Sequence, residues 1–101
     1  MRMKHETVFG HNISVWDDGP KVCDRYTVVY LDEVDERGNV PYVAMSAAPF
    51  HPQGFCQHGE MALFLVAYDG RGGIFKKRIT FKDLPEDCKK VVERDLKGAR
   101  K

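Results

Sequence analysis

The sequence predicts an α+β domain in which a small, twisted, mainly antiparallel sheet of four to five strands carries one C-terminal helix packed on it. Short stretches rich in β-branched and aromatic residues, separated by turn residues, predict the strands. One stretch near the C-terminus repeats apolar residues at helical spacing. With 101 residues, 43% of them hydrophobic, we expect a single folded domain over 1–101, with 1–11 and 98–101 poorly ordered.

The first strand is expected over Asn12 to Trp16, where Ile13 and Val15 alternate with Ser14 and Trp16. The turn residues of 17–21 follow it. Residues 25–31 are apolar on both faces and predict the central strand. A charged hairpin loop over 32–39 leads to a third strand at 40–45, which has a proline near its start.

Two later stretches are harder to assign. Met61 to Tyr68 is apolar at every position and could be a buried strand or a short helix; its length and the glycine-rich turn behind it favour a strand. Ile74 to Phe81 alternates, with Phe75, Ile79 and Phe81 on one side and a basic outer side opposite. This pattern predicts a half-exposed strand.

The C-terminal helix has the clearest signal. Asp83 is expected to cap it, with Pro85 tolerated in the first turn and Glu86 three residues after the cap. Lys97 and Gly98 are expected to close the helix. Its predicted buried stripe consists of Leu84, Cys88, Val91, Val92 and Leu96.

Residues 49–60 hold the densest group of polar and turn-forming side chains: two Pro, two Gly, two His, one Cys and one Glu. This composition predicts an ordered loop that places polar groups. Arg25, at the start of the central strand, could pair with Asp24, organise this loop or bind a ligand. The candidate ligand- or partner-binding residues are therefore Arg25, His51, Gln53, Gln57, His58 and Glu60.

The same loop contains one cysteine and two histidines. His51, Cys56 and His58, with Cys23 as a fourth ligand, do not have the ligand spacing of a common closed zinc site, so we expect no metal. Cys56 beside His58 could form a thiolate–imidazolium pair, but no oxyanion hole is visible, and we expect no catalytic residue. Nor is there a phosphate-binding motif, and no cofactor is expected.

Charge is unevenly distributed although the net value is only +1. Residues 1–70 carry five Lys or Arg against ten Asp or Glu, a net −5, whereas residues 71–101 carry eleven against five, a net +6. A near-neutral total makes nucleic acid a less favoured partner than protein. Four acids gather in one expected loop and could face a basic partner: Asp32, Glu33, Asp35 and Glu36.

Three blocks together resemble a family of short uncharacterised proteins from bacteriophages, prophages and other mobile elements. They are residues 23–29 (Cys-Asp-Arg-Tyr-Thr-Val-Val), 49–60 with its Pro-Phe-His-Pro-Gln-Gly-Phe core, and 77–87 (Lys-Arg-Ile-Thr-Phe-Lys-Asp-Leu-Pro-Glu-Asp). The resemblance covers roughly residues 14–97 and implies an intracellular accessory protein. It implies no catalytic residue, and the family often has Asn or Gly where this chain has Cys56.

These observations predict a non-enzymatic protein-binding module of a mobile element. Its partner would be a host or phage protein, and its most concrete role is inhibition of a host defence complex, as anti-CRISPR proteins do. The alternative is a small-molecule or nucleotide binder, or a weak hydrolase, that uses the 49–60 loop. No apolar run is long enough to span a bilayer and no export signal is visible, so we expect a cytoplasmic location and no membrane partner. The resemblance implies that this cytoplasm is that of a bacterial host.

Overall fold

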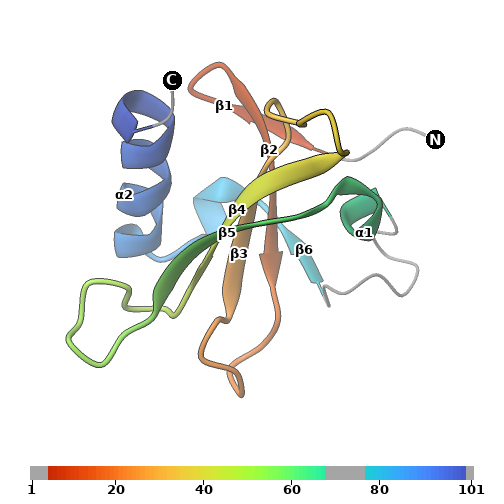
Figure 1. The fold of residues 1–101 in the computed structure, drawn as a ribbon. Coiled ribbons are helices and arrows are strands. Elements are labelled where there is room, and N and C mark those ends of the chain that lie inside the picture. The colour runs from red at the N-terminus through yellow and green to blue at the C-terminus, as the bar shows by residue number, and fades with distance from the viewer. Residues whose placement is uncertain (1–4, 68–76, 100–101) are drawn as a thin grey trace.

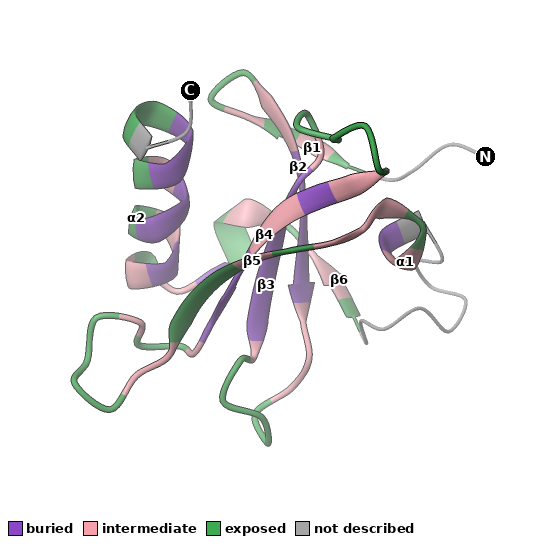
Figure 2. Cartoon of the chain, viewed as in Figure 1, coloured by how far each residue is buried: buried purple, intermediate pink, exposed green. Residues whose placement is uncertain are grey.

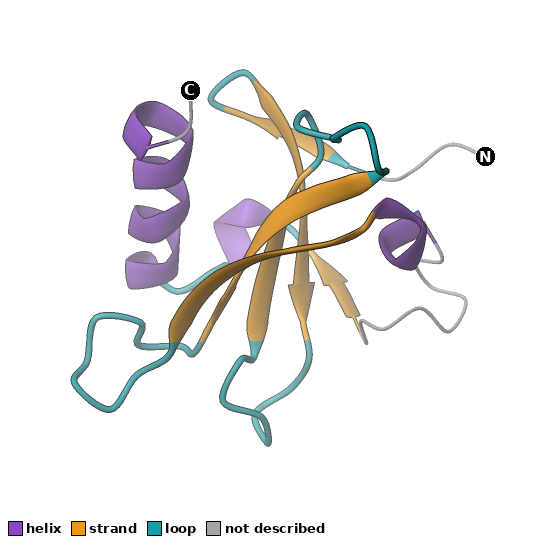
Figure 3. Cartoon of the chain, viewed as in Figure 1, coloured by secondary structure: helices purple, strands orange, loops and turns teal. Residues whose placement is uncertain are grey.

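Strand β3 (Tyr26–Tyr30) lies in the middle of a six-stranded sheet in the computed structural model of the chain, which describes residues 5–67 and 77–99 (Figure 1). Every residue of β3 is buried, as its apolar sequence on both faces predicts. The fold class is confirmed: the sheet is antiparallel, with a C-terminal helix, α2 (Glu86–Arg94), on one face (Figure 3). The described part of the sheet has six strands, one more than the upper expected number.

The strands follow one another in space as they do in sequence, from β1 (Glu6–Val8) through β2 (His11–Asp17), β3 and β4 (Asn39–Met45) to β5 (Cys56–Ala62). A short sixth strand, β6 (Lys77–Ile79), pairs with β2 on the side opposite β3, over Val15 to Asp17. Strand β1 pairs with the other half of that same side of β2.

Strands β1 and β2 form a hairpin in a stretch whose first part, residues 1–11, was expected to be poorly ordered; residues 1–4 lie outside the described residues. β1 and β2 are joined by a two-residue turn in which Phe9 and Gly10 both have positive φ, 51° and 81°. That is the backbone of the tight hairpin turn whose twist suits antiparallel strands. The Phe9 ring lies edge-on to Phe81, with centroids 6.2 Å apart, and Lys97 Nζ lies 4.5 Å from its centre. These contacts join the hairpin to the C-terminal region, a long-range effect that local sequence does not reveal.

One face of the sheet, which we call the helix face, is covered by α2. The predicted stripe is confirmed, since all five of its members are buried (Figure 2). They pack in one core cluster with the sheet residues Ile13, Val15, Tyr26, Val28, Tyr30, Val43 and Met45.

The opposite face, which we call the open face, is only partly covered. Trp16, Val29 and Val40 pack there with Val66 from a short helix, α1 (Leu63–Ala67). The expectation that residues 61–68 form one strand is therefore wrong: β5 ends at Ala62 and the chain turns into α1. An uninterrupted apolar run does not distinguish the two structures, and burial against Trp16 selects the helix.

The ends of the C-terminal helix also differ from expectation. Asp83 does not cap α2; its carboxylate accepts hydrogen bonds from Thr80 N at 3.0 Å and Thr80 Oγ1 at 2.9 Å, in a short 3-10 turn over Phe81–Asp83. The helix begins at Glu86, after Pro85, whose backbone is extended. Beyond Arg94 the chain continues as a π-helical turn, Asp95–Ala99, in which Gly98 does not adopt a positive φ.

The half-exposed strand predicted over Ile74 to Phe81 is shorter than expected. Within the described residues it comprises Lys77–Ile79 only, because Phe81 already belongs to the 3-10 turn; positions 74–76 lie outside the described residues. Arg78 is half-buried, and its Cζ lies 5.7 Å from the centre of the Trp16 ring across the β2–β6 pair. Part of the expected basic outer side therefore covers an aromatic core residue.

Replacing Val92 by Asp is expected to destabilise the protein by several kcal/mol, because it puts an unpaired charge at a fully buried position under the helix. Lys90→Asp, on the exposed side of the same helix, is the matched control and should cost no more than about 1 kcal/mol. Urea denaturation of both variants measures the difference. Equal midpoints would mean that α2 is not docked on the sheet.

Candidate functional site

Half of the segment expected to be a loop is an edge strand. Residues 56–60 belong to β5, and only 46–55 form the connection from β4. A strand directs successive side chains to opposite faces, so Gln57 lies on the open face, while His58 and Glu60 lie on the helix face. Gln57 is therefore separated from His58 and Glu60, although all three were predicted to belong to one site.

The connection is held by its own side chains. Ser46 Oγ accepts from Phe55 N at 3.0 Å, and His51 Nδ1 accepts from Gln53 N at 3.0 Å. Gly54 is required, because a Cβ there would lie 1.9 Å from the Ala48 carbonyl oxygen. His51 is thus engaged in loop structure, and the Gln53 side chain is exposed.

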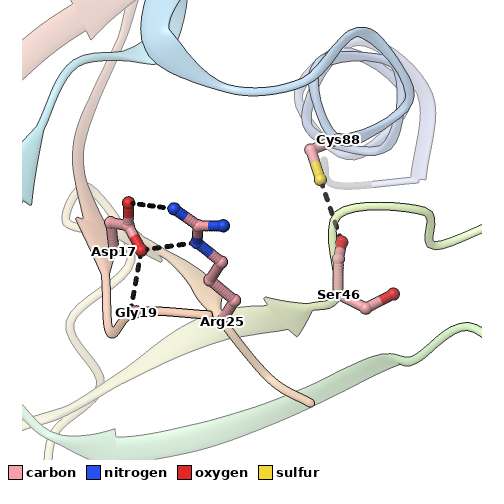
Figure 4. A network of polar contacts seen from close by, with 5 residues as sticks. All are labelled: Asp17, Gly19, Arg25, Ser46 and Cys88. Carbon is pink, nitrogen blue, oxygen red and sulfur yellow. Dashed lines mark hydrogen bonds and ion pairs between the residues drawn. The ribbon is translucent and has the colours of Figure 1, made fainter. Parts of the chain in front are cut away.

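Arg25 pairs with Asp17, not with Asp24 or the 46–55 connection (Figure 4). Its Nε and Nη2 donate to the two carboxylate oxygens at 2.8 and 3.2 Å, and Gly19 N donates to Asp17 Oδ1 at 2.9 Å. The Arg25 hydrogen bond is the main reason that the pKa of Asp17 lies below its ordinary value. The pair closes the β2–β3 connection at its base.

Two adjoining cavities, of about 500 and 650 Å³, share Asp17, Arg25 and Lys77 in their walls. Lys21 lines the first cavity, and Asp83 lines the second. Hydrogen bonds from Thr80 lower the pKa of Asp83 as well, so both carboxylates are charged at neutral pH. The two cavities are therefore lined by charges of both signs, not by cations alone.

A polar cluster of two buried residues and the exposed His58 lies where the end of α2 meets β3 and β5. Asp95 is 5% exposed and accepts from the Tyr30 hydroxyl at 2.5 Å; His58 Nε2 lies 2.9 Å from the same carboxylate oxygen. Tyr30 and Asp95 were not among the predicted site residues. The sequence did contain a signal for Asp95, because this acid falls among the apolar positions of the helical stripe. An acid at such a position needs a buried partner.

The cysteines near this cluster are not activated. Burial raises the pKa of the Cys88 thiol to about 12, and its Sγ donates to the Ser46 carbonyl oxygen at 3.2 Å (Figure 4). Burial, and then the charge of Asp95, also raises the pKa of Cys56. A nucleophilic cysteine needs the opposite shift.

The open face has a cavity of about 270 Å³ beside β5. Its lining residues include two aromatic residues, Tyr42 and Phe55, together with Gln57 and two acids, Asp18 and Asp24. The remaining lining residues are Thr27, Ala44 and Met61.

The four predicted acids lie between β3 and β4 and are exposed. Two of them also hold the backbone: Asp32 Oδ2 accepts from Asn12 N, and Asp35 Oδ1 accepts from the N–H groups of Arg37 and Asn39. They are therefore partly structural, which the sequence did not reveal.

Strand β5 is the last strand of the order, so only one of its edges is paired within the described part of the chain. Ser46 N donates to Phe55 O at 2.9 Å, and Leu63 N donates to Gly38 O at 2.8 Å. Hydrogen-bonded pairs alternate along an antiparallel ladder, so the odd-numbered residues of β5 bond to β4. The residues that direct backbone N–H and C=O groups to the other edge are Cys56, His58, Glu60 and Ala62.

Within residues 5–67 and 77–99, no group of three or more His, Cys, Asp and Glu side chains could hold a metal ion. In the same ranges, no helix has the length and hydrophobicity needed to cross a membrane. Comparison with known proteins adds no relative, since no family model, curated protein or solved structure matches the chain.

Tyr30→Phe is expected to destabilise the protein by about 2 kcal/mol, because it removes a hydrogen bond to a buried carboxylate. Tyr42→Phe is the control and should change the free energy of unfolding by less than about 0.5 kcal/mol, as a half-buried position allows. Chemical denaturation at pH 7 compares the two. Equal losses would show that the Tyr30–Asp95 contact adds nothing specific.

Alkylation of the native protein at pH 8 should modify the exposed Cys23 first, Cys56 more slowly and Cys88 only after unfolding. The reason is that a raised pKa keeps the Cys56 thiol protonated, so its rate should continue to climb above the ordinary thiol pKa, whereas Cys88 is buried and out of reach of the reagent. Peptide mapping by mass spectrometry gives the three rates. Faster modification of Cys56 than of Cys23 would contradict this and would restore the nucleophile hypothesis.

Proposed function

We propose that this protein is a non-enzymatic protein-binding module, and that a partner protein adds an extended segment to the free edge of β5. The observation that carries the proposal is the edge itself, seven residues long, with four of them directing backbone groups away from β4. An added strand satisfies such groups, and the hydrogen bonds that it forms supply affinity.

The surroundings of the edge support a basic partner. Asp18 and Asp24, from the β2–β3 connection, line a cavity that Gln57 of β5 also lines, and Glu60 lies within the strand. The acidic loop lies at the far end, where Leu63 N bonds to Gly38 O. Glu60 and the acidic loop at the Ala62 end of β5 would speed the approach of a positively charged segment.

The alternative, a nucleotide or small-molecule site in residues 49–60, has less support. His51 is used within its loop, and Gln57 and His58 point to opposite faces, so the polar groups do not converge. The larger cavities near Arg25 contain charged Asp17 and Asp83, which would oppose a phosphate. Surface binding explains the arrangement without a cofactor or a reaction.

Inhibition of a host defence complex by a phage or mobile-element protein is the most concrete form of this proposal. It is supported by the sequence resemblance and by the acidic groups, which could occupy the nucleic-acid-binding surface of such a complex. A host or phage protein would then be the partner, in the cytoplasm of the bacterial host.

Glu60→Pro tests the edge directly. The Glu60 N–H points away from β4, so proline removes an outward donor and leaves the β4–β5 ladder intact. Affinity capture from bacterial lysate, read by mass spectrometry, should recover a specific partner with the parent protein and with Glu60→Ala. With Glu60→Pro we expect recovery to fall at least about tenfold, as loss of main-chain pairing implies.

A variant of the acidic loop distinguishes binding at the edge of β5 from binding at that loop. Replacing Asp32 and Asp35 by Asn, and Glu33 and Glu36 by Gln, removes four charges but keeps side-chain acceptors for the backbone. It should slow association, with a smaller effect at high salt. Undiminished capture by Glu60→Pro would contradict strand addition, and loss only in the acidic-loop variant would assign the contact to that loop.

A further inference from the structure

We infer that the free edge of β5 pairs with β5 of a second copy of this chain, so that two antiparallel sheets join into one about a two-fold axis. A partner segment of the proposed kind has to displace the second copy, so self-pairing controls access to the edge. That displacement rests on the proposed function, whereas the pairing rests only on the edge and its side chains.

The two edges of the described sheet differ in the features that prevent strand pairing. The edge opposite β5 is formed by β1 and β6, which have three residues each, and β6 begins with Lys77. Short strands and lysine are two of the ways in which proteins protect an edge. In contrast, β5 has seven residues, contains no Lys, Arg or Pro, and pairs with β4 without a bulge. It is therefore the edge that suits another strand.

Only one register of a two-fold pair uses the whole strand. The residues that direct backbone groups outward are Cys56, His58, Glu60 and Ala62. In an antiparallel ladder, a hydrogen-bonded pair needs two such residues opposite each other. When the axis passes beside Gly59, Cys56 lies opposite Ala62 of the second copy and His58 lies opposite its Glu60, so all four are paired. An axis at His58 or Glu60 would leave one of the four outside the pairing, and at Glu60 it would also put two carboxylates opposite each other.

The side chains of this register are complementary on the helix face. Directly opposite residues point to the same face, so the exposed His58 of each copy meets the exposed Glu60 of the other. His58 Nε2 lies 2.9 Å from Asp95 Oδ2 within its own chain. In the protonated ring, Nδ1–H then donates to the Glu60 carboxylate of the second copy. The two-fold symmetry produces this pair twice.

Gly59 lies at the axis of this register. It forms a non-hydrogen-bonded pair with its copy, and the Cα atoms of such a pair approach to about 4.5 Å. A Cβ on Gly59 would lie 2.8 Å from Tyr42 Oη, so only a glycine leaves the Tyr42 ring in this position. The two Tyr42 rings therefore lie on either side of the axis on the open face, where Gln57 of each copy is opposite Met61 of the other.

The helices leave room for the second copy. Asp95 contacts Tyr30 on β3 and His58 on β5, so the end of the helical region lies over β4. Its two copies would be about three strand spacings, or roughly 14 Å, apart, which exceeds the helix diameter of about 10–12 Å. At the ends of the paired strands, the acidic loop of one copy lies toward residues 46–55 of the other, which contain no Asp or Glu.

Sedimentation equilibrium at pH 6 tests the pairing over about 5 to 500 µM, because the dimer fraction depends on concentration. This pH is below the ordinary histidine pKa of about 6.5. The parent should change from the mass of one chain to twice that mass, whereas Glu60→Pro, which lacks an outward donor, should stay monomeric. Glu60→Gln should raise the Kd of the dimer about fivefold, as the loss of two cross-strand charge pairs implies. Glu86→Gln, on the exposed side of α2, is the matched control and should leave the Kd unchanged.

An engineered disulfide tests the register. Gln57→Cys with Met61→Cys, in a chain that also has Cys23→Ser and Cys56→Ser, should link two copies on treatment with oxidised glutathione. Positions 57 and 61 lie opposite each other across the axis, with Cα atoms about 4.5 Å apart. The same two positions within one chain, and the two copies of position 57, are at least about 13 Å apart, too far for a disulfide. Gln57→Cys alone should therefore form no linked dimer, and peptide mapping should find the 57–61 link in the double variant.

The inference is overturned if the parent stays monomeric at every concentration, if Glu60→Pro still dimerises, or if Gln57→Cys alone links as fast as the double variant. A monomeric parent whose capture of a partner is lost in Glu60→Pro would leave the proposed function standing alone.

The linked dimer tests the displacement. Its edge is covered, so it should capture at least about tenfold less partner from bacterial lysate than the same protein after reduction with dithiothreitol. Equal capture before and after reduction would contradict both the displacement and the proposed function at this edge, while the self-pairing measured by sedimentation would stand.

Discussion

Docking of α2 on the helix face is the interaction on which the rest of the structure depends. The stripe from Leu84 to Leu96 covers the middle strands, so apolar residues of β2, β3 and β4 leave water together. The same docking brings Asp95 to Tyr30, 65 residues earlier in the chain, and to His58 on β5. One end of the edge strand is thereby tied to the helix, while its outer backbone groups stay directed away from the sheet.

The buried cluster is better understood as a structural joint than as a catalytic centre. A carboxylate that is 5% exposed is costly unless it is paired, and the Tyr30 hydroxyl and the His58 ring provide the pairing. The nearby Cys56 has a raised pKa, so its thiol is a poor nucleophile. The His58–Asp95 contact ties β5 to the end of the helix, so a partner of the proposed kind would meet an edge whose geometry is already defined.

The two faces of the sheet differ in how they are packed. The helix face holds the main core and is closed by α2, whereas the open face has a smaller cluster around Trp16, partly covered by α1. Tyr42, Gln57 and Met61 lie on the open face next to a cavity with acidic and aromatic walls. The alternation of side chains along β5 therefore puts the His58–Asp95 contact on one face and the cavity-lining residues Gln57 and Met61 on the other.

The sequence by itself determined the fold class, the central position of residues 26–30 and the buried stripe of α2, because these depend on local periodicity and hydrophobicity. It also pointed to residues 49–60 as a segment of interest. Only the tertiary structure decided that Cys56–Ala62 is an edge strand, that 63–67 is helical and that Arg25 pairs with Asp17. Apolar runs and polar clusters are compatible with several local structures, and long-range contacts select one of them. Asp95, Tyr30 and His58 come from three separate segments, and they meet only because α2 packs across the sheet.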